Sequence, residues 1–427
     1  MNDEPNLQQF VDHLSSFSDE GAQSGTAVPA NGEKMPAIGI VQEIAGSGSA
    51  VSMDAALLHQ LSTSADMSVA MAGQVGSQVK MQVASAWLIA NVRTMRAGKP
   101  GEVLANVDFL GEGQMASGGR MVNFRRGVTR YPIPGSPIYP VNTEDMRSIF
   151  AADDSPHIEI GTVYPTDDIR GALYIDPMLS KHFAVLGSTG TGKSTAVALI
   201  LHRISHLSPE GHIVMIDPHG EYSAAFKDCG ELFNVDNLQL PYWLMNFEEH
   251  CEVFLTSDGS ERQRDADILG KCLLSARTKG KNIEQYGKVT VDSPIPYLLT
   301  DLSAVLTAEM GKLDRAGDTT PYQRLKNKLD ELRADPRFTF MFSGMLVSDT
   351  MAGFCAKLFR LPAQGKPISI VDVSGVPSEI TSVVVSVLAR MVFDYAIWSR
   401  TEAQRPLLLV CEEAHRYVPK EIGRAHV

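Results

Sequence analysis

Residues Gly187 to Ser194 read GSTGTGKS, a complete GxxxxGK[ST] phosphate loop. The loop lies between an apolar run, His182 to Leu186, and a helix-favouring run, Ala196 to His206. A buried strand that ends in such a turn places backbone N–H groups around a phosphate, at the positive end of the following helix. This context between a predicted strand and a predicted helix favours a nucleoside triphosphate site over a flexible Gly/Ser turn without a ligand.

Length and composition limit the classes of protein to consider. A chain of 427 residues is long for one hydrophobic core, so two or three domains are expected. Its 44% hydrophobic and 21% charged residues are typical of a globular protein, and its net charge of −12 argues against a uniformly basic nucleic-acid-binding surface. A ring-shaped DNA motor needs positive charge only along its channel. The acidity therefore does not exclude DNA as a partner.

The sequence shows no signal for secretion or for a membrane. It starts with MNDEPNLQQF, which is acidic rather than basic and then apolar. The most apolar stretch, Ser382 to Trp398, is interrupted by Arg390 and Asp394. We therefore predict a cytoplasmic protein. The cysteines are odd in number and lack CxxC spacing, which indicates reduced thiols; they are Cys229, Cys251, Cys272, Cys355 and Cys411.

The chain divides into three regions of different composition. Residues 1–35 contain few large apolar residues and are predicted to form a disordered leader. Residues 36–176 carry short alternating runs such as IGIVQEI and VKMQV between glycines, which indicates antiparallel strands closed into a barrel or sandwich. Residues 177–427, with the phosphate loop near their start, are predicted to form an α/β core.

Three short, continuous apolar runs in this core are typical of strands buried on both faces of a parallel sheet. They are HIVMID (212–217), ISIVDV (368–373) and LLLVCEE (407–413). Between the first two, at about residues 246–362, the chain is rich in helix formers. The predicted helices there span residues 262–277, 296–312 and 321–334. We therefore expect a helical subdomain inserted into the core.

The segment from Gly113 to Thr143 contains four arginines and no carboxylate; the arginines are Arg120, Arg125, Arg126 and Arg130. Such a segment could contact nucleic acid or a neighbouring subunit. It could equally be a solvated arginine hairpin, and the sequence leaves both interpretations open.

A phosphate loop needs acidic residues at a second strand end to hold Mg²⁺ and to polarise the attacking water. Lys193 would neutralise the β- and γ-phosphates, and Ser194 would bind Mg²⁺. After the run LLLV, Glu412 would act on Mg²⁺, directly or through water, and Glu413 would be the general base. The predicted ATP-binding residues are Gly187, Ser188, Thr189, Gly190, Thr191, Gly192, Lys193, Ser194 and Thr195.

The loop DPHGEY follows the run HIVMID, at the same expected edge of the sheet. Its Asp217, His219 and Glu221 could contact Mg²⁺ or a neighbouring subunit. The loop could also be an ordinary turn whose polar residues are solvated. Asp372, which ends another predicted strand, could support the site or could simply cap a turn.

Five phrases of the chain resemble the HerA family of the FtsK–HerA superfamily of P-loop motors: HFAVLGSTGTGKST, IVMIDPHGEY, LQLPYWLMNFEE, ISIVDVSGVPSEI and LLLVCEEAHRYVP. The region from IGIVQEI onward resembles the small N-terminal barrel of these proteins, so the likeness covers nearly everything after residue 35. The resemblance implies a RecA-like core. The predicted fold is thus an α/β P-loop NTPase with a RecA-like parallel sheet, an N-terminal β-barrel and an inserted helical subdomain.

The resemblance also implies an activity. HerA proteins form hexameric rings around double-stranded DNA and use ATP to translocate or unwind it. They act in DNA-end processing beside a NurA-type nuclease, or in antiphage defence with other effectors. By this likeness Lys193 and Ser194 match the Walker A residues, and Glu412 and Glu413 match the Walker B pair. Lys181 falls where relatives often have an arginine near a neighbouring subunit's nucleotide.

Relatives continue past the Walker B strand to a sensor residue and an arginine supplied to the adjacent site, whereas this chain ends at Val427. Loss of such an arginine costs roughly 10³ to 10⁵ in turnover. We therefore expect this chain to bind ATP but to hydrolyse it poorly. The last seven residues, EIGRAHV, read like a translated sequencing adapter, so we expect the natural protein to be longer.

The leading hypothesis is a DNA translocase or helicase, and two alternatives stay open. A secretion or conjugation ATPase would move protein or single-stranded DNA at a membrane, but the chain lacks an apparent membrane anchor. A nucleotide-dependent scaffold would assemble a nuclease or another effector, with ATP turnover secondary.

Overall fold

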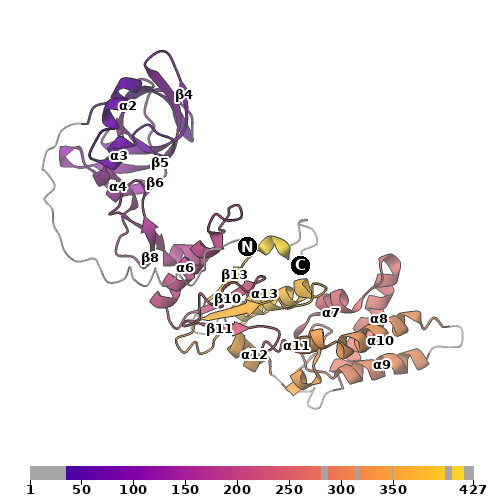
Figure 1. Cartoon of the computed structure of the whole chain (residues 1–427). Helices are drawn as coiled ribbons and strands as arrows, with labels where there is room; N and C mark the ends of the chain where they lie inside the picture. The colour runs from indigo at the N-terminus through magenta and orange to yellow at the C-terminus, as the bar shows by residue number, and fades with distance from the viewer. Residues whose placement is uncertain (1–34, 280–286, 313–316, 349, 400–405, 418–427) are drawn as a thin grey trace, which may run out of the picture. The chain divides into compact units, whose positions relative to one another are not determined.

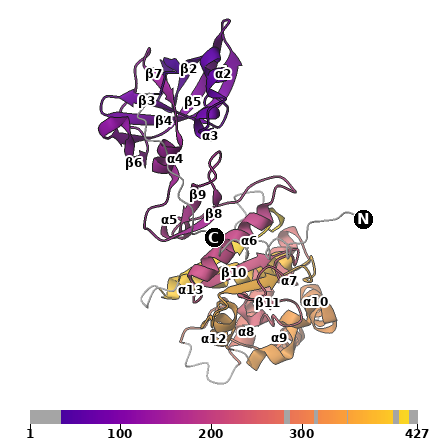
Figure 2. The same cartoon turned by 60° about the vertical axis from the view of Figure 1, so that its left-hand side comes forward.

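A computed structural model describes residues 35–279, 287–312, 317–348, 350–399 and 406–417. The chain forms two units, of which the first ends at Ala184 and the second starts at Val185 (Figures 1 and 2). Residues 1–34 of the predicted leader and the terminal EIGRAHV lie outside the described residues.

Seven antiparallel strands build the main sheet of the first unit: β1 (Gly39–Ile44), β2 (Gly48–Asp54), β3 (Gln78–Val83), β4 (Ala86–Ala97), β5 (Glu102–Met115), β6 (Met121–Arg126) and β7 (Pro137–Pro140). Their order is β2-β1-β7-β3-β4-β5-β6, and β2 also pairs with β5. This last pairing closes β1–β5 and β7 into a barrel, while β6 extends the far end of β5.

Alternating side chains fill the barrel. Val51 and Met53 of β2, and Val79 and Met81 of β3, are buried in one cluster with alternating residues from the middle of β4 and from β5. Successive side chains of a strand point to opposite faces, so this period of two directs one face of each strand inward. A shift of register by one residue would expose the whole set.

Short helices cover the barrel: α2 (Ala55–Leu61), α3 (Met67–Ala70), the 3₁₀ turn η2 (Ser117–Gly119) and α4 (Thr143–Phe150). Lys80 of β3 and Asp145 of α4 form a buried ion pair at 2.5 Å. The strands β8 (His157–Thr162) and β9 (Arg170–Tyr174) form a separate hairpin, followed by α5 (Ile175–Leu179). The first unit thus extends eight residues beyond the predicted boundary at residue 176.

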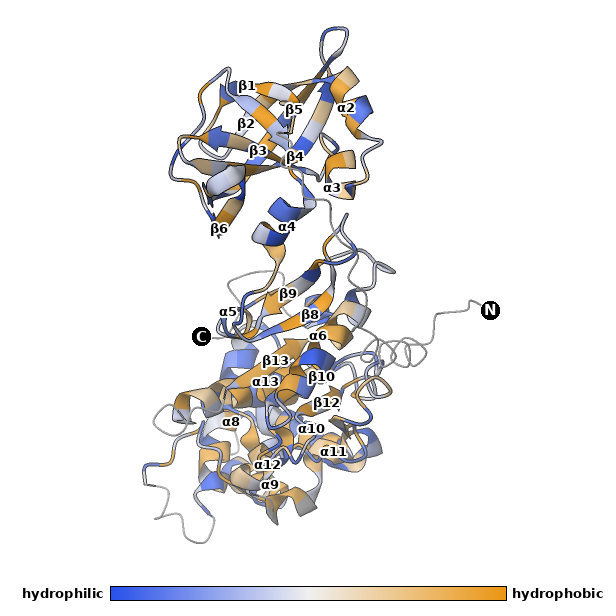
Figure 3. Ribbon diagram, turned by 90° about the vertical axis from the view of Figure 1, so that its left-hand side faces the viewer, coloured by the Kyte–Doolittle hydropathy of each residue, from blue (hydrophilic) through white to orange (hydrophobic). Residues whose placement is uncertain are grey.

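The second unit contains a parallel sheet of four strands in the order β11-β12-β10-β13. These strands are β10 (His212–Asp217), β11 (Gly230–Phe233), β12 (Ile368–Asp372) and β13 (Leu407–Cys411), and the helices α6 (Lys193–Leu207) and α13 (Thr381–Trp398) belong to the same unit. The residues of β10 and β12 are almost all buried, and Figure 3 shows the apolar character of these strands. In the described chain β13 is one of the two outer strands, paired only with β10 and half-buried.

The prediction of a buried strand from His182 to Leu186 is wrong. These residues form no strand and are exposed, with Leu186 at 88% of its maximal exposure. A strand exists only where a neighbour pairs with it, and no described strand pairs with this run. The apolar run indicates burial but does not encode its pairing partner.

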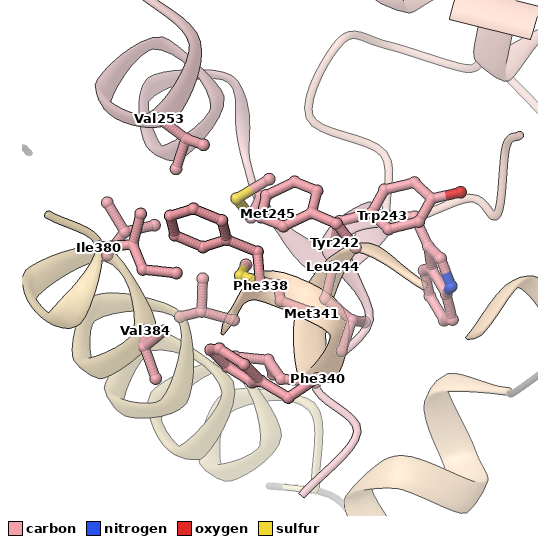
Figure 4. Close-up of a cluster of buried hydrophobic side chains, with 14 of the residues drawn as sticks. Tyr242, Trp243, Leu244, Met245, Val253, Phe338, Phe340, Met341, Ile380 and Val384 are labelled. Atoms are coloured by element: carbon pink, nitrogen blue, oxygen red, sulfur yellow. The ribbon is translucent and has the colours of Figure 1, made fainter. Parts of the chain in front are cut away.

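Helices and short turns occupy the chain between β11 and β12: η3 (Tyr242–Leu244), α7 (Phe247–Phe254), α8 (Gly259–Arg277), α9 (Leu299–Gly311), α10 (Thr320–Ala334), η5 (Pro336–Phe338), α11 (Thr339–Phe342), η6 (Gly344–Ser348) and α12 (Met351–Leu358). Helices α8, α9 and α10 pack against one another. Figure 4 shows how Phe338 lies among Met245, Val253 and Ile380. One continuous apolar core therefore joins this helical region to α13.

Helix α13 is the one helix among the described residues that is long and apolar enough to cross a membrane by length and composition alone. Seven of its residues are buried in the core of the second unit. Its Arg390 forms an ion pair with the buried Glu249 of α7 at 2.8 Å and donates to the carbonyl of Leu244 at 2.7 Å. These contacts are those of a core helix in a globular protein.

Candidate nucleotide site

The phosphate loop runs directly into the first turn of α6. Gly190 and Gly192 adopt left-handed φ values of 82° and 86°, which glycine reaches without strain. Gly192 caps α6 without any side-chain hydrogen bond, so the N–H groups of the first turn stay open to a ligand. Residues 187–192 are exposed and residues 193–195 are half-buried. An exposed ring of backbone N–H groups at a helix N-terminus is suited to bind phosphate.

Two side chains shape the interior of this loop. Thr191 donates its hydroxyl to the carbonyl of Ser188 at 2.7 Å, and the Lys193 ammonium reaches the same carbonyl at 3.2 Å. A Cβ on Gly187 would lie 2.6 Å from the Thr191 hydroxyl, so any other residue there would displace this hydroxyl. The Lys193 charge therefore lies over the loop, where a phosphate would compete for it with a neutral carbonyl.

Parallel strands bring the acidic residues to one edge of the sheet. Asp217 of β10 lies opposite Asp372 of β12, and Cys411 of β13 lies opposite Ile216. Glu412 follows Cys411 directly, and its backbone N–H bonds to the Ile216 carbonyl at 3.2 Å. The carboxyl ends of these strands thus meet where α6 begins.

The central contact of the site joins Ser194 to Glu412. The Ser194 hydroxyl donates to Glu412 Oε1 at 3.2 Å, across 218 residues of sequence. These are the two residues for which the sequence predicts Mg²⁺ binding. Tyr417 fixes the same segment by donating its hydroxyl to the Glu412 carbonyl at 2.7 Å. Hydroxyl and carboxylate oxygens are the ligands that Mg²⁺ prefers.

Glu413 lies in a strained turn directly after Glu412. Its φ of 47° is left-handed, which is uncommon for a residue with a side chain and recurs at functional sites. Its carboxylate lies 3.1 Å from His415 Nδ1 and is only partly exposed. The turn therefore directs Glu413 away from the path of the strand, next to an imidazole.

The DPHGEY loop is organised by Asp217. This carboxylate is fully buried and accepts the backbone N–H groups of His219, Gly220 and Tyr222 at 3.1, 2.9 and 3.0 Å. Asp217 therefore holds the loop rather than facing a ligand. Glu221 and His219 are exposed, and the Arg416 guanidinium lies 3.2 Å from His219 Nε2.

The structure also places the remaining residues named from the sequence. Asp372 accepts the Ser374 N–H at 2.9 Å, which is an ordinary turn contact. Lys181 is exposed and belongs to the first unit. In the arginine segment, Arg120 pairs with Glu144 at 3.2 Å and Arg125 with Glu112 at 2.6 Å, while Arg126 and Arg130 are exposed.

Sequence reasoning missed Tyr222, Arg416 and Tyr417. Tyr222 is fully buried beside the site, and the other two contact the loop and Glu412. The signal in the sequence is an aromatic residue at the end of each polar motif, in DPHGEY and in EEAHRY.

The residues present fit ATP with Mg²⁺. No cluster of three His, Cys, Asp or Glu side chains suited to a metal occurs in the described ranges. A site built from one hydroxyl, one carboxylate, water and phosphate oxygens needs no such cluster, because Mg²⁺ keeps several waters and binds substrate phosphates.

The chain is similar to a known protein family and to several known proteins. Residues 158–392 match the family model described as "Helicase HerA, central domain". A probable helicase of Methanocaldococcus jannaschii is 23% identical over 68% of this chain and 52% of its own length. The DNA double-strand break repair helicase HerA of Pyrococcus furiosus is 36% identical over 39% of this chain and 29% of its own length.

Two further proteins are also similar to this chain. A probable DNA double-strand break repair helicase HerA of Methanocaldococcus jannaschii is 23% identical over 74% of this chain and 67% of its own length. Among solved structures, VirB4 of Thermoanaerobacter pseudethanolicus covers 63% of this chain and 70% of its own length, with 14% identity and a TM-score of 0.44. The chain spans about half or less of the first two relatives.

Proposed function

Because the chain belongs to the HerA helicase family, we propose that it binds ATP with Mg²⁺ and couples ATP hydrolysis to movement along double-stranded DNA. The observation that carries this proposal is the Ser194–Glu412 contact at 3.2 Å, which joins the phosphate loop to the end of β13. A P-loop NTPase requires this combination of a phosphate cradle and a second acidic strand end.

Each residue of the site has a role in this proposal. The first-turn N–H groups of α6 and the Lys193 ammonium bind the phosphates, and Ser194 and Glu412 hold Mg²⁺. Glu413 orients the attacking water and accepts its proton. When bound, Mg²⁺ neutralises charge that develops on the phosphate oxygens. The left-handed turn at Glu413 separates this carboxylate from Glu412, so two adjacent residues can act on different groups.

We further propose a RecA-like core that assembles as a hexameric ring around duplex DNA in the cytoplasm. A NurA-like nuclease or another effector would act beside it. The exposed Arg126 and Arg130 support a DNA or subunit contact on the barrel, because no acidic residue occurs in their segment of the sequence.

Equilibrium binding of a fluorescent ATP analogue tests the nucleotide part of the proposal. Wild-type protein should bind it, and Lys193→Ala should weaken binding about tenfold to a hundredfold, because a charged hydrogen bond contributes about 1.5–3 kcal/mol. Glu413→Gln should bind normally, because this residue acts on water. Absence of binding by the wild type would overturn the proposal. Gel filtration with and without ATP and duplex DNA tests the ring.

A further inference from the structure

Tyr222 is a buried residue of the DPHGEY loop with an unusual hydroxyl. The side chain is fully buried, and its ring stacks on Phe226 with centroids 6.0 Å apart and planes within 4°. Asp217 holds its backbone N–H at 3.0 Å. Among the described residues, its hydroxyl oxygen has no hydrogen-bond partner. Buried polar groups are nearly always paired, so this exception calls for a physical explanation.

The groups that act on this hydroxyl belong to the nucleotide site. Burial raises the pKa of Tyr222, the Ser194 hydroxyl lowers it, and the carboxylates of Glu412 and Asp217 raise it. A tyrosine hydroxyl carries one proton and can donate it in a hydrogen bond. Ser194 and Glu412 are also the residues that contact each other at 3.2 Å. Tyr222 is bound to Asp217 at the end of β10, and the neighbouring Ile216 carbonyl accepts the Glu412 N–H. The Tyr222 hydroxyl thus lies beside the pair assigned to Mg²⁺.

The donors and acceptors around the Tyr222 hydroxyl favour Glu412 as its hydrogen-bond partner. Ser194 has one proton, which it gives to Glu412 Oε1. Mg²⁺ would take a lone pair of the Ser194 oxygen and would leave that proton in place. The Glu412 carboxylate has room for further donors, because two oxygens offer about four acceptor positions. Asp217 is already occupied by three backbone N–H groups.

We propose that Tyr222 is a positioning residue of the Mg²⁺ site, whose hydroxyl donates to the Glu412 carboxylate when the metal binds and holds it against Ser194. The inference rests on the proposed function of this site. The ring stack on Phe226 and the backbone hydrogen bond to Asp217 fix the tyrosine, so its hydroxyl points in one direction. Groups that orient a metal ligand in this way typically contribute 10–100-fold to metal affinity.

The substitution Tyr222→Phe removes only the hydroxyl and keeps the ring. We would measure affinity for the fluorescent ATP analogue in EDTA, and then the Mg²⁺ concentration for half-maximal binding at fixed nucleotide. The affinity in EDTA should be unchanged, and the Mg²⁺ midpoint should rise about tenfold or more. In a Glu412→Gln background, Tyr222→Phe should have little further effect, because the two groups act as a unit.

Tyr242→Phe is the matched control. Tyr242 is equally buried, but its hydroxyl donates to the Tyr297 carbonyl at 2.5 Å, away from the nucleotide site. This variant should lower the melting temperature and leave the Mg²⁺ midpoint unchanged. Tyr222→Phe should leave the melting temperature without ligand unchanged or higher, since it removes an unpaired buried hydroxyl.

The outcomes separate this inference from the proposed function. A wild-type protein without Mg²⁺-dependent nucleotide binding would overturn both. A wild type that binds, with an unchanged midpoint in Tyr222→Phe, would overturn only the positioning role. Equal losses of affinity in EDTA and in Mg²⁺ would do the same, because they indicate a structural role for the tyrosine.

Discussion

The barrel and the parallel sheet treat their strand edges in opposite ways. In the barrel, the β2–β5 pairing closes the ring of strands, so the backbone of these strands pairs within the unit. The parallel sheet stays open, and β13 pairs on one side only within the described chain. The carboxyl ends of its parallel strands lie together, and residues 218 positions apart meet there. The closed barrel therefore favours stability, whereas the strand ends of the open sheet create the site.

The barrel and the second unit also differ in how they hold their buried charged side chains. The barrel buries the direct pair of Lys80 and Asp145. The second unit also has such a pair, between buried Glu249 and Arg390. In addition it buries Asp217 under backbone N–H groups, and Arg277 over three backbone carbonyls. Charge in the barrel therefore fixes helix to strand, whereas charge in the second unit fixes both helices and loops.

The largest expected effect is on the barrel. Lys80→Met leaves Asp145 buried without its counter-ion, which should cost about 3–5 kcal/mol. Hydrogen exchange measured by mass spectrometry should increase in barrel peptides and not in peptides of the parallel sheet. The double variant Lys80→Met/Asp145→Asn should recover part of the loss, because no buried charge is left. Faster exchange in both units would contradict the independence of the two cores.

A slightly smaller effect is expected in the second unit. Asp217→Asn places an amide N–H₂ group against one of three backbone donors, which should cost roughly 2–3 kcal/mol. Denaturant unfolding and nucleotide affinity should both report the change. Asp372→Asn is the control: Asp372 accepts one N–H, from Ser374, so little should change. Similar losses for both variants would show that the two strand-end carboxylates have equivalent roles.

Acid should affect the two units at different pH. Burial lowers the pKa of His250 to about 3, and nearby arginines add to this. The unfolded chain binds this proton below pH 6.5, so the free energy of unfolding of the second unit should fall by about 1.4 kcal/mol per pH unit below that. Hydrogen bonds from Arg125 and Thr129 lower the pKa of Glu112 from 4.5 to about 2, so the barrel loses this contribution only below about pH 4.5.

Hydrogen exchange at pH 7, 5.5 and 4.5 would measure this difference. We expect faster exchange in the second unit first, and a flatter pH dependence for His250→Gln, which cannot titrate. Simultaneous opening of both units at pH 5.5 would show that other groups control the acid sensitivity.

The smallest effect concerns DNA. Arg126→Ala and Arg130→Ala should each reduce the slope of log affinity for duplex DNA against log salt by about one. Arg120→Ala should change the slope less, because Arg120 already pairs with Glu144 at 3.2 Å. Fluorescence anisotropy of labelled duplex DNA measures these slopes. Unchanged slopes for all three would favour the solvated hairpin.

Local patterns predicted much of the second unit. The runs starting at His212, Ile368 and Leu407 coincide with β10, β12 and β13, and the three predicted helices match α8, α9 and α10 within three residues at each end. These elements have a clear period or a continuous apolar run, which a single sequence displays. These strands and helices can therefore be predicted without information from distant parts of the chain.

Long-range contacts were not predictable in the same way. The run from His182 to Leu186 has the composition of a strand but no pairing partner in the described chain. The approach of Tyr222 to Ser194 and Glu412 depends on strand order, which the local sequence does not specify. The sequence named the residues of the site but not the buried tyrosine beside them.

Hydrogen exchange of the wild-type protein with and without Mg²⁺ and ATP tests the central claim most directly. The account predicts slower exchange in two segments at once, Gly187–Thr195 and the turn around Glu412, with no change in the barrel strands. Slower exchange in the phosphate loop alone, or none in either segment, would contradict a site that joins α6 to the end of β13.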